Sequence, residues 1–143
     1  MSSRTVRTTH AEQTEALGAE LARSLRPGDV VLLRGEMGSG KTTFVRGAAR
    51  QLGTRAPVTS PTYTIGRRYD EASPPVAHLD LHRLESLQDE DPALLDDYLT
   101  DSHVVFVEWP EVADGELPRV RWTVTLAHAG ADAREITIAE VAA

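Results

Sequence analysis

The sequence predicts an α/β fold in which helices pack against a mostly parallel central sheet. Two short, continuously apolar segments, 30–33 and 104–107, have the composition of strands that are buried on both faces. Segments with helical periodicity alternate with such strands along the chain, which is typical of parallel strands joined by helices. With 143 residues, of which 41% are hydrophobic and 26% charged, we expect a single domain over residues 1–143.

The first part of the chain is expected to contain a helix, a strand and a second helix. Thr9 and Glu12 fit a capping box, in which the threonine begins the helix and the glutamate reaches back to it. Leucines then recur at helical spacing up to a Pro-Gly stop. After the strand at 30–33 comes a glycine-rich segment and then a helix that ends at Gly53.

The second part is expected to add strands, one helix and turns. Residues 57–69 have the composition of a loop that leads into a strand, and a turn is expected near Asp114-Gly115. The regular elements expected here are strands at 76–82 and 103–108, a helix from Asp91-Pro92 through Leu99, and an antiparallel pair of strands at 121–126 and 134–141.

Composition narrows the function classes. Acidic residues outnumber basic ones by 22 to 15, and the net charge of −7 argues against a broad basic face for a nucleic-acid backbone. Without cysteine the chain has no disulfide, no thiolate metal site and no cysteine nucleophile. No apolar run has the length of a membrane span, and the first residues lack the apolar segment of a secretory signal. We therefore expect a cytoplasmic protein that binds no membrane.

One segment carries a complete phosphate-binding signature. Residues 35–42 read Gly-Glu-Met-Gly-Ser-Gly-Lys-Thr, which matches the G-x-x-x-x-G-K-[ST] pattern of a P-loop. Its glycines let successive backbone N–H groups turn toward phosphate oxygens, and the helix that follows adds free amides and the positive end of its dipole. Lys41 is the only lysine of the sequence, whose other 14 basic residues are arginine, so this position requires a compact ammonium. We expect Lys41 to contact the β- and γ-phosphates and Thr42 to place its hydroxyl on Mg²⁺.

Two acids are candidates for the magnesium side of this site. Glu108 follows the apolar run 104–107, where P-loop proteins carry an acid that holds the metal or its water; a solvated strand-end glutamate is the alternative. Asp80 lies inside an expected strand, so it either acts near the phosphates or occupies the polar face of a half-buried strand. His78 and His82 share the side of Asp80, and we interpret them as structural or surface histidines rather than as metal ligands.

The expected fold class is thus a P-loop NTPase-like three-layer sandwich with a mostly parallel central sheet and antiparallel C-terminal strands. The sequence has no asparagine, which excludes the Asn-Lys-x-Asp motif through which GTPases specify guanine. Its length leaves little room for the acceptor pocket and arginine-bearing lid of a small-molecule kinase. Three functions remain open: an ATPase, a phosphotransferase acting on a small metabolite, and a nucleotide-binding module without hydrolysis.

Three further segments follow the P-loop in order: Ser60-Pro61-Thr62-Tyr63-Thr64, His78-Leu79-Asp80-Leu81-His82-Arg83-Leu84 and Val107-Glu108-Trp109-Pro110-Glu111. Together the four segments resemble the TsaE (YjeE) family, the small bacterial ATPases required for the threonylcarbamoyladenosine (t6A) modification of tRNA. The resemblance runs from about Thr9 to the end of the chain. One departure is His82, where the family often has tyrosine.

The resemblance implies slow, partner-dependent hydrolysis of ATP to ADP with Mg²⁺. Lys41, Asp80 and Glu108 would be catalytic, and Thr42 and Glu108 would hold the metal. The residues implied to bind ATP are Gly38, Ser39, Gly40, Lys41, Thr42, Thr43 and Asp80, with Ala11 and Arg134 approaching the base or the phosphates. A switch-like group would comprise Ser60, Thr62, Tyr63 and Trp109. The implied partners are TsaD and TsaB; TsaD transfers the group to tRNA, so this chain would meet tRNA only through the complex.

Overall fold

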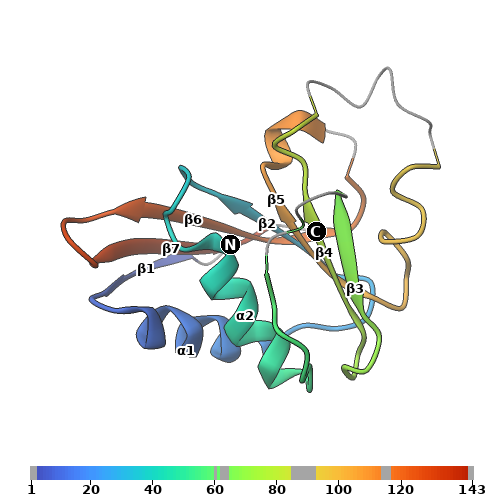
Figure 1. Ribbon diagram of the computed structural model, residues 1–143, viewed down its shortest axis with the longest axis horizontal. Coiled ribbons are helices and arrows are strands. Elements are labelled where there is room, and N and C mark those ends of the chain that lie inside the picture. The colour runs from blue at the N-terminus through green and yellow to red at the C-terminus, as the bar shows by residue number, and fades with distance from the viewer. Residues whose placement is uncertain (1–2, 60, 62–64, 85–92, 114–116, 142–143) are drawn as a thin grey trace.

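The fold is built on one seven-stranded mixed sheet with the strand order β1-β7-β6-β2-β5-β4-β3 (Figure 1). The computed structural model describes residues 3–59, 61, 65–84, 93–113 and 117–141. Its elements are β1 (Ser3–Thr8), α1 (Ala11–Ala22), β2 (Val30–Arg34), α2 (Lys41–Gln51), β3 (Gly66–Tyr69), β4 (Val76–Asp80), β5 (Val104–Glu108), the 3₁₀ helix η1 (Pro110–Ala113), β6 (Val120–His128) and β7 (Arg134–Glu140).

The centre of the sheet is parallel and its two edges are antiparallel. Strand β2 pairs in parallel with β5 and β6, and β4 pairs in parallel with β5. At the edges, β3 runs antiparallel to β4, and β7 runs antiparallel to both β6 and β1. The predicted α/β fold class, with a mostly parallel centre and antiparallel C-terminal strands, is confirmed.

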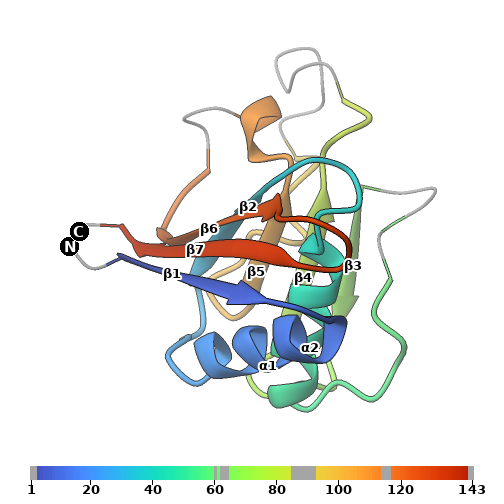
Figure 2. The same ribbon diagram turned by 90° about the vertical axis from the view of Figure 1, so that its left-hand side faces the viewer.

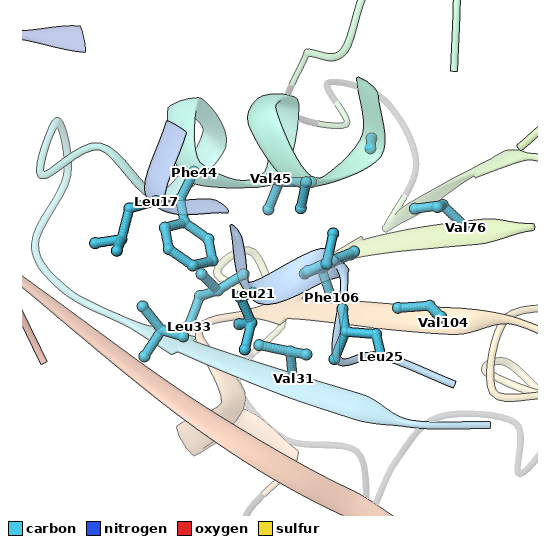
Figure 3. Close-up of a cluster of buried hydrophobic side chains, with 14 of the residues drawn as sticks. Leu17, Leu21, Leu25, Val31, Leu33, Phe44, Val45, Val76, Val104 and Phe106 are labelled. Atoms are coloured by element: carbon cyan, nitrogen blue, oxygen red, sulfur yellow. The ribbon is translucent and has the colours of Figure 1, made fainter. Parts of the chain in front are cut away.

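Both α-helices cover the same face of the sheet, as the rotated view in Figure 2 shows. Leu17 and Leu21 of α1 and Phe44 of α2 pack there against Leu33 of β2 and Phe106 of β5 (Figure 3). Residues on the alternate positions of the same strands face a second apolar cluster. In the described part of the chain this second face is covered by the turns of residues 93–99 and by η1.

The two helices cross in direct backbone contact. A Cβ atom added at Gly18 of α1 would collide with the backbone carbonyl of Phe44, and one added at Gly47 of α2 would collide with that of Glu15. Glycine at both positions therefore lets α2, which begins at the P-loop, lie close to α1 and to the sheet.

The beginning of α1 differs from the predicted capping box. His10 is the N-cap residue and makes no side-chain cap bond. The Gln13 side chain, rather than that of Glu12, reaches back: its Oε1 accepts hydrogen bonds from the Thr9 N–H at 2.6 Å and from the Thr9 hydroxyl at 3.1 Å. An amide oxygen satisfies the free N–H as well as a carboxylate does, so the spacing alone did not identify the partner.

Two further expectations about elements need correction. Residues 93–98 form turns rather than the predicted α-helix, and the expected start at Asp91-Pro92 lies outside the described residues, as does the turn at Asp114-Gly115. Strand β1 was not predicted from the sequence. No helix among the described residues combines the length and apolar character that crossing a membrane demands.

Candidate functional site

The P-loop joins the carboxyl end of β2 to the first residue of α2, as its sequence context predicts. Gly38 and Gly40 have φ angles of 75° and 104°, a region that side chains with a Cβ rarely adopt. A Cβ at Gly35 would lie 2.6 Å from the Leu126 carbonyl oxygen. The loop thus needs its glycines, and it places the N-terminal amides of α2 at the carboxyl edge of the sheet.

The Lys41 side chain is held inside this loop. It is only 5% exposed, and its Nζ donates a hydrogen bond of 2.6 Å to the Gly35 carbonyl. The same atom lies 4.0 Å from the centroid of the Trp109 ring, a cation–π contact. Burial lowers the pKa of Lys41 from its ordinary value, although the negative charges of Glu108, Asp80 and Glu111 act in the opposite direction.

A buried network joins α2 to the two neighbouring strands. The Thr42 hydroxyl donates to Glu108 Oε2 at 3.1 Å, and His78 Nε2 lies 2.6 Å from the same oxygen. Glu108 is 3% exposed and His78 is fully buried. Asp80 pairs with Glu108 in the parallel register of β4 and β5, so both predicted acids end their strands side by side.

Asp80 lies at the end of its strand rather than in mid-strand, where the sequence predicted it. Strand β4 ends at Asp80 and all five of its residues are buried, so the alternative of a half-buried strand with a polar face is wrong. The Oδ1 atom of Asp80 accepts a hydrogen bond from the His82 N–H at 3.1 Å and lies 2.6 Å from His82 Nδ1. The His82 ring in turn lies 6.4 Å from that of Trp109. His82 lies in the turn after β4, which ends at Asp80, so the expected strand at 76–82 is two residues too long.

The donors gathered here fit Mg²⁺. They are a hydroxyl and carboxylates, the oxygen ligands that this cation takes together with waters and substrate phosphates. Among the described residues no group of three or more His, Cys, Asp or Glu side chains forms a cage for a metal. A site of one hydroxyl and one carboxylate therefore suits a cation that arrives with a phosphorylated ligand.

A cavity of about 280 Å³ opens beside the P-loop. Ala11 and Arg134, the two residues expected near the nucleotide base or phosphates, both line it, together with Gly40 and Thr43. Arg134 also donates to the Gly38 carbonyl at 3.1 Å, so the start of β7 is tied to the loop. His10, Thr14 and Asp132 complete the lining and were not singled out from the sequence.

The predicted switch-like group is only partly described. Ser60, Thr62 and Tyr63 lie outside the described residues. Trp109 lies in the site and has a φ angle of 58°. Next to the group, the Arg83 guanidinium donates to the Pro61 carbonyl at 2.6 Å.

Fold and site together define a P-loop protein. The sequence model of the family described as "Threonylcarbamoyl adenosine biosynthesis protein TsaE" matches residues 8–136. The chain therefore belongs to the TsaE family, and the resemblance noted in the sequence is confirmed.

Individual relatives agree with this assignment. The chain is 40% identical over 135 residues to "tRNA threonylcarbamoyladenosine biosynthesis protein TsaE" of Bacillus subtilis, covering 94% of this chain and 84% of that protein. It is 44% identical over 119 residues to the protein of the same name from Streptomyces coelicolor, covering 81% and 80%. The crystal structure of Bacillus subtilis YdiB superposes with a TM-score of 0.81 at 33% identity, covering 99% of this chain and 87% of that one.

Proposed function

We propose that this chain is a Mg²⁺-dependent ATPase that supports t6A modification of tRNA in a complex with TsaD- and TsaB-like proteins. Family membership supports the pathway. ATPase activity is supported above all by one observation at the P-loop. The ammonium of Lys41 is buried there, next to the hydrogen-bonded side chains of Thr42 and Glu108.

Each residue has a physical role in the proposed hydrolysis. The backbone amides of Gly38, Ser39, Gly40, Thr42 and Thr43 would bind phosphate oxygens at the start of α2. Lys41 has three N–H donors and uses one on the Gly35 carbonyl, so the others can donate to the β- and γ-phosphates. Thr42 and Glu108 would hold Mg²⁺, which when bound neutralises charge on the transferring phosphoryl group.

Asp80 would orient the water that attacks the γ-phosphate. It ends β4 beside Glu108, and its Oδ1 is fixed by the backbone N–H and the ring of His82. A carboxylate held in this way can accept a hydrogen bond from a water and orient it toward the γ-phosphate. The base would occupy the cavity lined by Ala11 and Arg134.

The proposal extends to the domain, its location in the cell, the switch-like group and the partner proteins. Residues 1–143 would act as one ATPase domain, and its place beside proteins that modify tRNA implies the cytoplasm. Ser60, Thr62, Tyr63 and Trp109 would act as a switch that senses the γ-phosphate. Partners would make turnover fast by completing the site, and the acidic net charge of −7 suits contact with proteins rather than with the tRNA backbone.

The test is an assay of ATP consumption under three conditions. The purified chain is measured alone, with candidate small metabolites, and with TsaD- and TsaB-like proteins plus tRNA. We expect slow Mg²⁺-dependent release of phosphate from the chain alone and a higher rate with partners and tRNA. Transfer of the phosphoryl group to a metabolite would replace the proposal with a kinase, and nucleotide binding without hydrolysis under all three conditions would reduce it to a binding module.

A further inference from the structure

A buried histidine contacts the carboxylate that the proposed function assigns to Mg²⁺. His78 lies within β4, next to Phe106 in the register of β5 and two residues before Asp80. Its Nε2 is 2.6 Å from Glu108 Oε2, the same oxygen that accepts the Thr42 hydroxyl. The network thus ties β4, β5 and the first turn of α2 to one oxygen atom.

The other nitrogen of the ring indicates which tautomer is present. His78 Nδ1 is buried and has no hydrogen-bond partner among the described residues. A neutral ring with its proton on Nε2 leaves only a lone pair without a partner, whereas any ring with a proton on Nδ1 would bury an unbonded N–H. The arrangement therefore favours His78 as a donor to Glu108.

Such a bond restricts where the carboxylate can go. Glu108 has several rotatable bonds, and the Lys41 ammonium is an attractive alternative partner on the same site. Both hydrogen bonds use Oε2, so Oε1 is engaged in neither of them. A carboxylate held by two donors keeps one oxygen for a cation and stays away from the lysine that the phosphates need.

We propose that His78 is a positioning residue that holds Glu108 through its Nε2–H, so that Glu108 binds Mg²⁺ and leaves Lys41 to the phosphates. This inference rests on the proposed function, because it assigns a role to His78 only if the site takes a Mg²⁺-nucleotide. His78 itself would contact neither the cation nor the nucleotide.

Two substitutions of His78 by side chains of similar size distinguish a hydrogen-bond donor to Glu108 from a side chain that only fills the space. His78→Gln keeps an N–H donor of comparable reach, whereas His78→Met fills the space without one. His103→Met is the matched control: His103 is also buried and its Nε2 lies 2.8 Å from the Asp70 carboxylate, but it precedes β5, at the strand end opposite to Glu108. Loss of a buried, carboxylate-bound histidine is thus tested once inside and once outside the site.

The main measurement is the affinity for a non-hydrolysable ATP analogue, by calorimetry with and without Mg²⁺. For His78→Met we expect the gain in affinity that Mg²⁺ provides to fall by about tenfold, the lower end for residues that orient metal ligands, because His78 acts only through Glu108. Affinity without Mg²⁺ should stay within about threefold of the parental value. His78→Gln should recover most of the gain, and His103→Met should keep all of it.

One further readout keeps the inference falsifiable even if His78→Met does not fold. In ¹⁵N-edited NMR of the parental protein, the His78 ring should show a proton on Nε2 and none on Nδ1. The opposite tautomer, or an unchanged Mg²⁺ gain in a folded His78→Met protein, would overturn the inference while leaving the proposed function intact. A parental protein that gains no affinity from Mg²⁺ would instead overturn the proposed function, and the role of His78 with it.

Discussion

Replacing Lys41 with methionine is expected to weaken nucleotide binding without destabilising the folded chain. The substitution keeps an unbranched side chain of similar length and removes the charge. On the nucleotide, a charge-assisted hydrogen bond to phosphate contributes about 1.5–3 kcal/mol, which corresponds to a loss of about 10- to 150-fold in ATP affinity. Hydrolysis should fall below detection, because the same ammonium stabilises charge on the transferring phosphoryl group.

The folded protein without nucleotide should not lose stability. The ammonium gives up its bond to the Gly35 carbonyl, worth about 1.5–3 kcal/mol, and its contact with the Trp109 ring, worth about 0.5–2 kcal/mol. Against these losses stands the desolvation of a nearly buried cation, which costs several kcal/mol. Burial dominates the direction in which the Lys41 pKa moves, so we expect a free energy of unfolding equal to or above the parental value.

The pH dependence follows from the same shift. The pKa of Lys41 is lower in the folded chain than its ordinary value of 10.5, so between these two values the unfolded chain binds more protons. The free energy of unfolding of the parental protein should therefore rise with pH between the folded and the ordinary pKa of Lys41. Below that window Lys41 is charged in the folded chain, and its burial lowers the stability. The advantage of Lys41→Met should be largest near neutral pH and shrink toward about pH 10.

The assays are phosphate release, calorimetry with ATP, and urea unfolding at both ends of that pH range. Arg50→Met is the control, since this cation lies at the far end of α2 and pairs with Glu15 at 3.4 Å. Unchanged hydrolysis in folded Lys41→Met protein would refute the P-loop assignment. A strong loss of stability at neutral pH would refute the reasoning about burial. Lys41→Arg should also fail to hydrolyse ATP, because a broad guanidinium does not replace a compact ammonium.

Three other predictions test neighbouring parts of the site and fold. Glu108→Gln should keep ATP affinity within about tenfold, or 1.4 kcal/mol, yet lose most Mg²⁺-dependent hydrolysis; a parental rate would transfer the metal-side role to Asp80. Gly47→Ala should lower the free energy of unfolding in urea by about 1–3 kcal/mol, because its Cβ meets the backbone of α1, and a more stable variant would contradict the close helix crossing. ATP analogue and ADP should give different protease cleavage across residues 57–69, different Trp109 fluorescence and different affinity for the TsaD–TsaB pair; identical values with either nucleotide and with none would rule out the switch.

Local signals account for the parts of the fold that were predicted. The P-loop, the apolar strands β2 and β5 and the alternating strands β6 and β7 each carry their own pattern, and the structure contains all of them. Strand β1 was missed because its residues are mostly polar and exposed. It pairs with β7, more than a hundred residues further along the chain, and a short sequence window does not contain that partner.

The site shows the same division between local and long-range information. Glu108 was singled out because it ends an apolar run, and in the structure its carboxylate accepts the Thr42 hydroxyl; that the two residues hold Mg²⁺ stays a prediction. The contact between His78 and Glu108 was not predicted, since it depends on the register of two strands joined by a long connection. A signal was present nonetheless: His78 precedes Asp80 by two residues, so a strand places both on one face.

A crystal structure of the chain with Mg²⁺ and a non-hydrolysable ATP analogue would show directly whether the P-loop site binds a Mg²⁺-nucleotide. We expect the cation on the Thr42 hydroxyl and the Glu108 carboxylate, the Lys41 ammonium on the β- and γ-phosphates, and the base in the cavity beside Ala11 and Arg134. A nucleotide bound elsewhere, or a cation that leaves Thr42 and Glu108 uncoordinated, would contradict this expectation.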